Sequence, residues 1–378
     1  MKISFLCFDI SDNSFARAAL LADAVSSVHQ VELLGPAKKG SIWEPLKNCR
    51  HSVKLFPWKR YPSFLSIIPD IIKAADGDLI FASKLRPTSF GISLLANRKV
   101  PILLDIDDWE LGFFSQAHFW GKVGRFLNFS NPDGMPYTWI MEQLTQFADG
   151  ITVSNRFLQK RFGGVLAPHC RDTTLLDPEK FNTNENKKKL GLEGKKTLMF
   201  LGTPRAHKGI DDLIALMGKI QTPNVHLAVI GTPDSTLEKN SPPNKKISFL
   251  PKIPFSDLGI YLSAADGVII PQRKSNATIG QMPAKIYDAM AMAKPIISTK
   301  VSDIPEALEN CGYVVEPGDV TELAQAVDSI FSDPIKAKEM GQKARAKCKE
   351  LYDIKNLEKT LLDLIEQVTK KNRRTHFS

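Results

Sequence analysis

Short apolar runs alternate with amphipathic stretches along almost the whole chain, and this alternation limits the folds that are open to it. The apolar runs have the length of strands, and the stretches between them have the periodicity of helices. The expected strands of the first half are residues 2–8, 30–34, 78–82, 100–106 and 150–153. Such alternation predicts βαβ units, in which helices connect parallel strands. The fold class expected is therefore α/β, with doubly wound parallel sheets.

A second series of the same kind follows a polar, charged run at 182–196. Its expected strands are residues 197–202, 225–231, 247–250, 266–271, 296–298 and 312–316. The composition of the run predicts a linker, and 378 residues suffice for two domains with separate cores. We therefore expect an N-terminal Rossmann-like domain over 1–182, a C-terminal one over 183–352, and a last helix over 353–378 that packs back toward the N-terminal domain.

The chain is basic, with 50 Lys and Arg against 41 Asp and Glu and a net charge of +9. Such a charge favours anionic substrates, nucleic acid or an acidic membrane face, or it serves only solubility. The basic residues form no block apart from 370–374. Nucleic acid is therefore not an expected partner.

The five cysteines are widely spaced and include no CxxC pair. This spacing argues against a disulfide framework and against a structural zinc site. No apolar run approaches the ~20 residues that span a bilayer. These features predict a cytoplasmic protein, and they leave open a peripheral contact with the inner face of the membrane.

One segment, residues 113–139, departs from the alternation because it combines many aromatic side chains with Lys122 and Arg125. Its aromatic residues are Phe113, Phe114, Phe119, Trp120, Phe126, Phe129, Tyr137 and Trp139. An aromatic and basic element can rest in a membrane interface or cover an acceptor. It can equally form a helical pair that packs in the core, and the sequence leaves both interpretations open.

A basic loop, FLGTPRAHKG at 200–209, joins an expected strand to an expected helix. Gly202 lets a ligand approach the backbone, and Arg205 and Lys208 place two cations beside it. A departing diphosphate needs such charge, because stabilising developing negative charge is a large catalytic term. No GxGxxG follows the first strand and no P-loop pattern occurs, so neither of these phosphate-binding fingerprints is expected.

A second loop, in the stretch 271–306, lies between the carboxyl end of a strand and a helix, where open α/β sheets bind ligands. Lys274 and Lys285 add positive charge there, and Asp288 stands one turn into the helix. A carboxylate at this place can accept hydrogen bonds from two hydroxyls of a ribose. It can also do no more than favour the helix dipole.

Carboxylates end the strand expected at 100–106. Asp105 falls within the strand, whereas Asp107 and Asp108 reach its C-terminal end. Neighbouring carboxylates repel one another and shift their pKa values, orient sugar hydroxyls, or bind a metal. A metal site would need more ligands than this loop supplies.

With these loops, the chain resembles the retaining glycosyltransferases of family 4, whose GT-B fold has two Rossmann-like domains facing a central cleft. The likeness covers nearly the whole chain and is strongest from 202 to 318. It rests on the loop at 200–209, on AADGVIIP at 264–271, on DAMAMAKPII at 288–297 and on VEPGD at 315–319.

The chain also departs from the family pattern. The family usually shows Glu-x7-Glu, of which Asp288 matches the second residue and Gly280 stands in place of the first. PAKIYD at 283–288 resembles a PxKxxE variant, in which the Lys takes over donor contacts. Thr203 replaces an Arg, whose role passes to Arg205, and Asp107 replaces a His.

The resemblance implies transfer of a sugar from a nucleotide-diphosphate sugar to an acceptor hydroxyl with retention of configuration, in glycan or cell-envelope polysaccharide synthesis. The acceptor would be a glycan, a lipid-linked molecule or a small molecule, and no cofactor or metal would be obligatory. A nucleotide-sugar epimerase on the same fold and a non-catalytic nucleotide-sugar-binding protein remain as alternatives.

The same resemblance assigns residues to the site. The catalytic residues expected are Asp107, Asp108, Arg205 and Lys208. The donor-binding residues expected are Gly202, Thr203, Arg205, Lys208, Lys274, Gly280, Pro283, Lys285, Ile286 and Asp288. Asn155, Arg171 and Asp172 match cleft-facing loops of the family, and Lys84 and Arg86 either face the cleft or solvate a loop.

Overall fold

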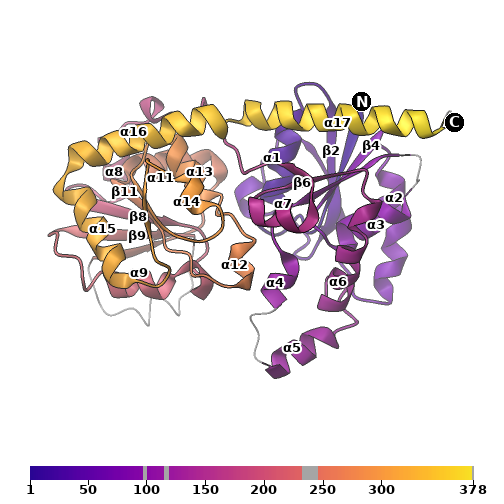
Figure 1. The fold of residues 1–378 in the computed structure, drawn as a ribbon, viewed down its shortest axis with the longest axis horizontal. Helices are drawn as coiled ribbons and strands as arrows, with labels where there is room; N and C mark the ends of the chain where they lie inside the picture. Colours follow the sequence, from indigo (N-terminus) through magenta and orange to yellow (C-terminus); the bar gives the residue numbers. More distant parts are fainter. Residues whose placement is uncertain (97–99, 115–118, 232–245, 377–378) are drawn as a thin grey trace. The chain divides into compact units, whose positions relative to one another are not determined.

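The computed structural model describes residues 1–96, 100–114, 119–231 and 246–376, and the chain divides into two compact units (Figure 1). The first unit comprises Met1–His169, Gly280–Met282 and Lys355–Ser378. The second comprises Cys170–Ile279 and Pro283–Ile354. Each unit has one parallel sheet with helices packed around it, so the expected fold class is confirmed.

The sheet of the first unit has seven strands in the order β3-β2-β1-β4-β5-β6-β7, and all neighbouring pairs are parallel. Its strands are β1 (Lys2–Cys7), β2 (Gln30–Ala37), β3 (Ser52–Pro57), β4 (Leu79–Ser83), β5 (Ile102–Ile106), β6 (Gly150–Val153) and β7 (Val165–Leu166). The two strands that sequence patterning missed, β3 and β7, are the edges: β3 is largely exposed and β7 has two residues. Neither forms the continuous apolar run of a buried parallel strand.

Helices of the first unit connect these strands in chain order. They are α1 (Phe15–Val25), α2 (Ile68–Ala74), α3 (Ile92–Leu95), α4 (Glu110–Phe114), α5 (Phe119–Phe126), α6 (Met135–Gln143) and α7 (Arg156–Phe162). The last helix, α17 (Ile354–His376), belongs to this unit from Lys355 onward. Its Leu364 and Val368 lie 3.3 and 3.0 Å from the place that a Cβ on Gly150 would take, so the glycine allows the helix to pack closely on β6.

The sheet of the second unit has six strands in the order β10-β9-β8-β11-β12-β13, again all parallel. The strands are β8 (Lys196–Leu201), β9 (Val225–Ile230), β10 (Ile247–Leu250), β11 (Gly267–Ile270), β12 (Ile296–Thr299) and β13 (Tyr313–Val315). The helices are α8 (Thr183–Lys189), α9 (Ile210–Leu216), α11 (Leu258–Ala264), α12 (Asn276–Ile279), α13 (Lys285–Ala291), α14 (Ile304–Ala307), α15 (Val320–Ser332) and α16 (Pro334–Leu351).

The run at 182–196 is not the linker that its composition predicts, because it contains α8. Asn182 caps this helix by accepting hydrogen bonds from the backbone N–H groups of Asn184 and Glu185, at 3.1 and 3.2 Å. Asn186 is buried and donates to Ser263 Oγ of α11 at 2.8 Å. The polar composition reflects a short helix with one narrow buried face. Over so few residues, the sequence of such a helix resembles that of a linker.

Strand order reverses once in each sheet, and this sets where polar loops can meet. In the first unit the chain builds outward from β1 through β3 and then returns to place β4 on the other side of β1. In the second unit β11 takes the corresponding place beside β8. In open α/β sheets the loops that leave such a pair of strands diverge, and ligands bind in the crevice at the carboxyl ends of the strands.

Candidate functional site

The loops that follow β8 and β11 lie side by side in the second unit. The backbone N–H of Arg273 donates to the carbonyl of His207 at 2.9 Å. Gly209 has φ +73, and a Cβ there would stand 2.0 Å from the carbonyl oxygen of Pro271. Only glycine fits this left-handed position at so close an approach. The two basic loops are therefore adjacent.

Positive charge gathers on this edge of the sheet. Lys208 Nζ lies 3.6 Å from the place that a Cβ on Gly202 would take, so the ammonium stands over the glycine backbone. Arg205 and Lys274 are exposed, and Lys285 is partly buried at the start of α13. These four cations come from two adjacent strand ends, which gives the edge a local positive potential.

The remaining predicted donor residues line the same two loops. Thr203, which follows Gly202 in the chain, is half-buried, and Pro283 is half-buried just before α13. Ile286 is fully buried, so its side chain belongs to the core and only its backbone could meet a ligand. Sequence reasoning did not single out Arg273, whose guanidinium pairs with the buried Asp212 of α9, with Nε 2.8 Å from Oδ2.

Asp288 is fully buried and held between two cations. Arg171 forms an ion pair with its Oδ1, and Lys285 Nζ lies 3.0 Å from its Oδ2. Burial alone would raise the pKa of this carboxyl, but Arg171 and then Lys285 outweigh that effect, and the pKa falls below its usual value. Asp288 is therefore ionised at neutral pH, and its service to a ribose remains a prediction.

Of Arg171, Lys285 and Asp288, Arg171 is the residue that is hardest to identify from the sequence. It also donates to the carbonyls of Cys170 and Ala284, at 2.7 and 3.2 Å. Its own carbonyl accepts from the backbone N–H of Ile354 at 2.9 Å. Arg171 and Asp288 are 117 residues apart, and no local pattern can report a pair so distant in the sequence.

A buried ion cluster occupies the ends of β4 and β5 in the first unit. Lys84 Nζ lies 2.8 Å from Asp107 Oδ1, 2.7 Å from Asp108 Oδ2 and 3.1 Å from Glu110 Oε1. Arg86 pairs with the other oxygen of Glu110. Both cations are at least nine-tenths buried. We call these five residues the Lys84 cluster; the predicted Asp107 and Asp108 belong to it.

The pKa values in the Lys84 cluster diverge. Burial raises the pKa of Asp107 to about 7, with Lys84 opposing the rise and Asp108 and Asp105 adding to it. Burial also acts to raise the pKa of Glu110, but Arg86 and Lys84 prevail and lower it to about 2. Arg86 and Lys84 thus keep Glu110 ionised, whereas burial lets Asp107 hold its proton to higher pH than an exposed carboxyl.

Lys84 has an unusual backbone for a non-glycine residue, with φ +74. Left-handed backbone costs an L-residue roughly 1–2 kcal/mol. Two hydrogen bonds hold it there: its N–H donates to the Asp105 carbonyl at 2.9 Å, and its carbonyl accepts from Ser89 Oγ at 2.8 Å. Strained residues of this kind concentrate at functional sites.

Asp105, in contrast, has a structural role. It is fully buried within β5 and accepts from Arg17 Nε and Nη2, at 3.1 and 2.8 Å, and from Thr152 Oγ1 at 2.7 Å. The expectation that it falls within the strand, away from Asp107 and Asp108, is confirmed.

Gly280 stands where no side chain fits. The segment Gly280–Met282 belongs to the first unit, and a Cβ on Gly280 would lie 2.5 Å from Cβ of Trp109. The Gly280 carbonyl accepts from the Trp109 N–H and from Asn155 Nδ2, both at 3.2 Å. Next to it, Gln281 Nε2 donates to Asp108 Oδ1 at 3.1 Å. Because Trp109 packs against Gly280, the carboxylate side chain that the family carries at this position would not fit here.

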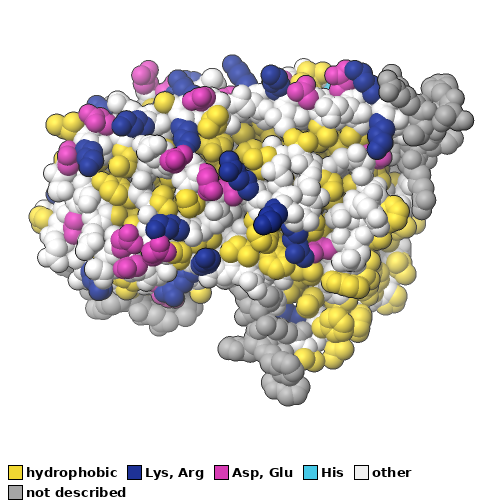
Figure 2. Space-filling view, viewed as in Figure 1, with side chains coloured by type: hydrophobic (Ala, Val, Ile, Leu, Met, Phe, Trp, Pro, Cys, Tyr) yellow, Lys and Arg dark blue, Asp and Glu magenta, His cyan; other side chains and the backbone are white. Residues whose placement is uncertain are grey.

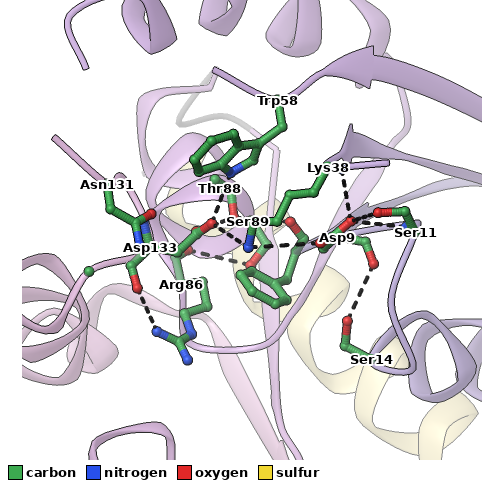
Figure 3. A network of polar contacts seen from close by, with 12 residues as sticks. Asp9, Ser11, Ser14, Lys38, Trp58, Arg86, Thr88, Ser89, Asn131 and Asp133 are labelled. Atoms are coloured by element: carbon green, nitrogen blue, oxygen red, sulfur yellow. Dashed lines mark hydrogen bonds and ion pairs between the residues drawn. The ribbon is translucent and has the colours of Figure 1, made fainter. Parts of the chain in front are cut away.

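A second polar network, which the sequence did not reveal, joins the loops after β1, β2, β3 and β4 (Figure 3). At its centre the buried Asp133 accepts from Thr88 Oγ1 at 2.7 Å and from Trp58 Nε1 at 3.1 Å, and pairs with Lys38 at 3.1 Å. Arg86 Nη1 donates to the Asp133 carbonyl at 2.9 Å. Arg86 thereby connects this network to the Lys84 cluster.

The aromatic segment forms α4, α5 and α6; residues 115–118 lie outside the described residues. Phe126, Leu127, Phe129, Trp139 and Ile140 are each 41–59% exposed. Figure 2 shows hydrophobic side chains gathered on the surface over α6. Tyr137 packs inward against Tyr61, with ring centroids 5.0 Å apart. The segment therefore both packs on the unit and leaves an apolar surface, and within the described residues no helix has the length and hydropathy to cross a bilayer.

Comparisons with known proteins show what parts of the chain are similar to. Residues 182–347 match the family model of the glycosyl transferases group 1. N-acetyl-alpha-D-glucosaminyl L-malate synthase of Bacillus anthracis is 26% identical over 175 residues, which cover 44% of each chain. The GDP-mannose-dependent alpha-(1-6)-phosphatidylinositol monomannoside mannosyltransferase of Mycolicibacterium smegmatis is 24% identical over 217 residues, 52% of this chain and 57% of that one. The chain thus spans about half the length of the curated relatives it matches.

The fold extends over almost the whole chain. The crystal structure of Anabaena HepE in complex with UDP-glucose superimposes with a TM-score of 0.77 at 16% identity, covering 97% of this chain and all of that one. The expected GT-B fold is confirmed by this likeness and by the two Rossmann-like sheets. Residues 182–347 are thus similar in sequence to the group 1 glycosyltransferases, and over the rest of the chain the likeness is one of fold.

Proposed function

We propose that the chain transfers a sugar from a nucleotide-diphosphate sugar to an acceptor hydroxyl with retention of configuration. The observation that carries the proposal is the cationic edge at the reversal of the second sheet, where Lys208 stands over Gly202 beside the loop of Arg273 and Lys274. Its place is the one where doubly wound sheets bind nucleotides. HepE, which shares the fold, has been crystallised with UDP-glucose, and this supports a nucleotide sugar as the donor.

The charges of the edge suit the departure of a nucleoside diphosphate. As the glycosidic bond breaks, the diphosphate gains negative charge, and Arg205 and Lys208 neutralise it. Fixed cations are effective in this task because they need no reorganisation during the reaction. Asp288, held ionised by Arg171 and Lys285, accepts hydrogen bonds from the ribose or orients Lys285 toward the donor.

In the first unit, we assign the handling of sugar and acceptor hydroxyls to the Lys84 cluster. Asp107 and Asp108 follow β5 at the carboxyl edge of the sheet, as the ligand-binding residues of α/β sheets do. Their carboxyl oxygens can accept hydrogen bonds from hydroxyl groups and so fix the orientation of the reacting oxygen.

The exposed aromatic surface favours an acceptor that is presented at a membrane. Between the buried Glu110 and the buried Glu142 the one acidic residue is Asp133, which is also buried, whereas Arg125 is exposed. A segment with exposed Phe and Trp side chains, an exposed Arg and no exposed acidic residue of its own suits the headgroup region of an anionic membrane. Transfer to a lipid-linked acceptor in cell-envelope synthesis would use such a contact.

A double variant tests the activity. Arg205→Ala with Lys208→Ala should abolish release of nucleotide from UDP-, GDP- and ADP-sugars in the presence of an acceptor extract. Lys338→Ala with Lys343→Ala removes the same charge from exposed positions of α16 and should leave the rate unchanged. Wild-type rates in the first variant would refute the donor site. Nucleotide released only with acceptor supports transfer, an altered free sugar indicates an epimerase, and saturable binding without turnover indicates a binding protein.

A further inference from the structure

We propose that Lys84 is a built-in cation that stands where three carboxylates would otherwise bind a divalent metal ion. It acts as a positioning residue, holding Asp107, Asp108 and Glu110 together without touching the substrate. The inference goes beyond the proposed sugar transfer, since it concerns cation binding and holds whatever reaction the site performs.

The geometry around Lys84 Nζ is that of a central cation. The three carboxyl groups offer oxygen atoms that all lie within 4.8 Å of one another, close enough to share one ion. The ammonium lies 2.7–3.1 Å from an oxygen of each. Hard divalent cations prefer oxygen ligands of this kind, so the carboxylates alone would suit such an ion.

Lys84 is placed for this role by its backbone as well as by its side chain. The residue is 5% exposed, and its φ of +74 is fixed by hydrogen bonds to the Asp105 carbonyl and from Ser89. A lysine kept in a strained conformation, without access to water, is not serving to solvate a loop. The surrounding structure stabilises this strained conformation, which places the ammonium between the three carboxylates.

Arg86 does not duplicate Lys84. Among the described residues its guanidinium forms an ion pair with Glu110 alone, and its Nη1 donates to the Asp133 carbonyl and to Thr138 Oγ1 at 2.9 and 2.8 Å. Loss of Lys84 would therefore leave Asp107 and Asp108 without a cation in contact among the described residues. A mobile metal ion is the replacement that these oxygens would take.

Metal binding tests the inference on the full-length chain with Mn²⁺ as the probe. After dialysis against EDTA, titration followed by the electron paramagnetic resonance of free Mn²⁺ should show no stoichiometric site in the wild type. Lys84→Ala should gain about one Mn²⁺ per chain with at least tenfold higher affinity, and Mn²⁺ should raise its melting temperature but not that of the wild type. Adding Asp108→Asn to Lys84→Ala should remove the new site.

Two further variants keep the test decisive. Lys84→Arg retains a cation and should gain no Mn²⁺, which separates charge from a merely structural change. Glycine accommodates the positive φ, so Lys84→Gly should fold even if Lys84→Ala fails to fold. Its affinity for Mn²⁺ should equal the affinity expected of Lys84→Ala.

Several outcomes would overturn the proposal. One is a folded Lys84→Ala or Lys84→Gly that binds Mn²⁺ no better than the wild type. A second is a stoichiometric Mn²⁺ site in the wild type that Glu110→Gln removes. A third is failure of both variants to fold with or without Mn²⁺, since a metal would then not replace the ammonium.

Discussion

Replacement of Arg171 by alanine should destabilise the second unit strongly, because it leaves a carboxylate buried without its main partner. Asp288 is fully buried, and the Arg171 side chain is 11% exposed, so water cannot take over the role of the guanidinium. Breaking a buried ion pair in this way typically costs roughly 3–5 kcal/mol. Since Lys285 still lies 3.0 Å from Oδ2, we expect the lower end, about 3 kcal/mol.

Thermal and urea denaturation of the purified variants measure this loss. For a unit of this size, each kcal/mol lowers the melting temperature by about 2–4 °C, so Arg171→Ala should melt about 6–12 °C below the wild type. Adding Asp288→Asn removes the unpaired charge and should restore part of the stability, with a coupling energy of about 0.5–3 kcal/mol. Lys300→Ala breaks an exposed pair with Glu316 in the same unit and should leave the melting temperature close to that of the wild type.

The dependence on pH gives a further check of the reasoning. The pKa of Asp288 is lowered in the folded protein, so its stabilising contribution is present above the ordinary carboxyl pKa and disappears as the pH falls through the lowered value. Without Arg171, burial has the larger effect and the pKa of Asp288 rises. The difference in stability between the wild type and Arg171→Ala should therefore be smallest at acidic pH, where Asp288 is protonated in the variant. The account would be refuted by a free energy of unfolding of Arg171→Ala within about 0.5 kcal/mol of the wild-type value. It would also be refuted if adding Asp288→Asn restored none of the lost stability.

Three other perturbations follow from the structure. Burial raises the pKa of Asp107 to about 7 in the folded protein, so its contribution to stability falls as the pH rises from about 4 to 7, by at most about 1.4 kcal/mol per unit. Asp107→Asn should flatten that part of a denaturation series across pH. Gly280→Glu restores the family carboxylate where a Cβ would lie 2.5 Å from Trp109, and should destabilise by about 1–3 kcal/mol in thermal unfolding without raising activity. Phe129→Glu with Trp139→Glu should reduce co-sedimentation with anionic liposomes at least fivefold.

Each of these predictions has a control and an outcome that would contradict it. An unchanged slope in Asp107→Asn would show that another group titrates near neutrality. Gly124→Glu introduces the same side chain where nothing lies within 4 Å, and equal stability loss in both glycine variants would argue against the Trp109 clash. Leu351→Glu changes an exposed apolar residue of α16, and equal loss of liposome binding there would place the membrane contact elsewhere.

Much of the fold and part of the site were predictable from the sequence. Alternating apolar runs predicted eleven strands of the two sheets, because a strand buried on both faces is apolar throughout. The two basic loops were predicted from their place between a strand and a helix, and the structure brings them together through Arg273 and His207. The edge strands β3 and β7 and the helix α8 were missed, since each is short or polar and local composition does not report what it packs against.

Sequence by itself determined most of the buried strands, where their carboxyl ends lie and which residues follow them, because periodicity and loop chemistry are properties of neighbours in the chain. Only the tertiary structure decided which charges meet. Arg171 pairs with Asp288, which lies 117 residues further along the chain, and Lys84 pairs with Asp108, which lies 24 residues further along. It also decided that Trp109 leaves Gly280 no room for a carboxylate. Burial makes these encounters matter, since a charge removed from water must find its partner wherever the fold places it.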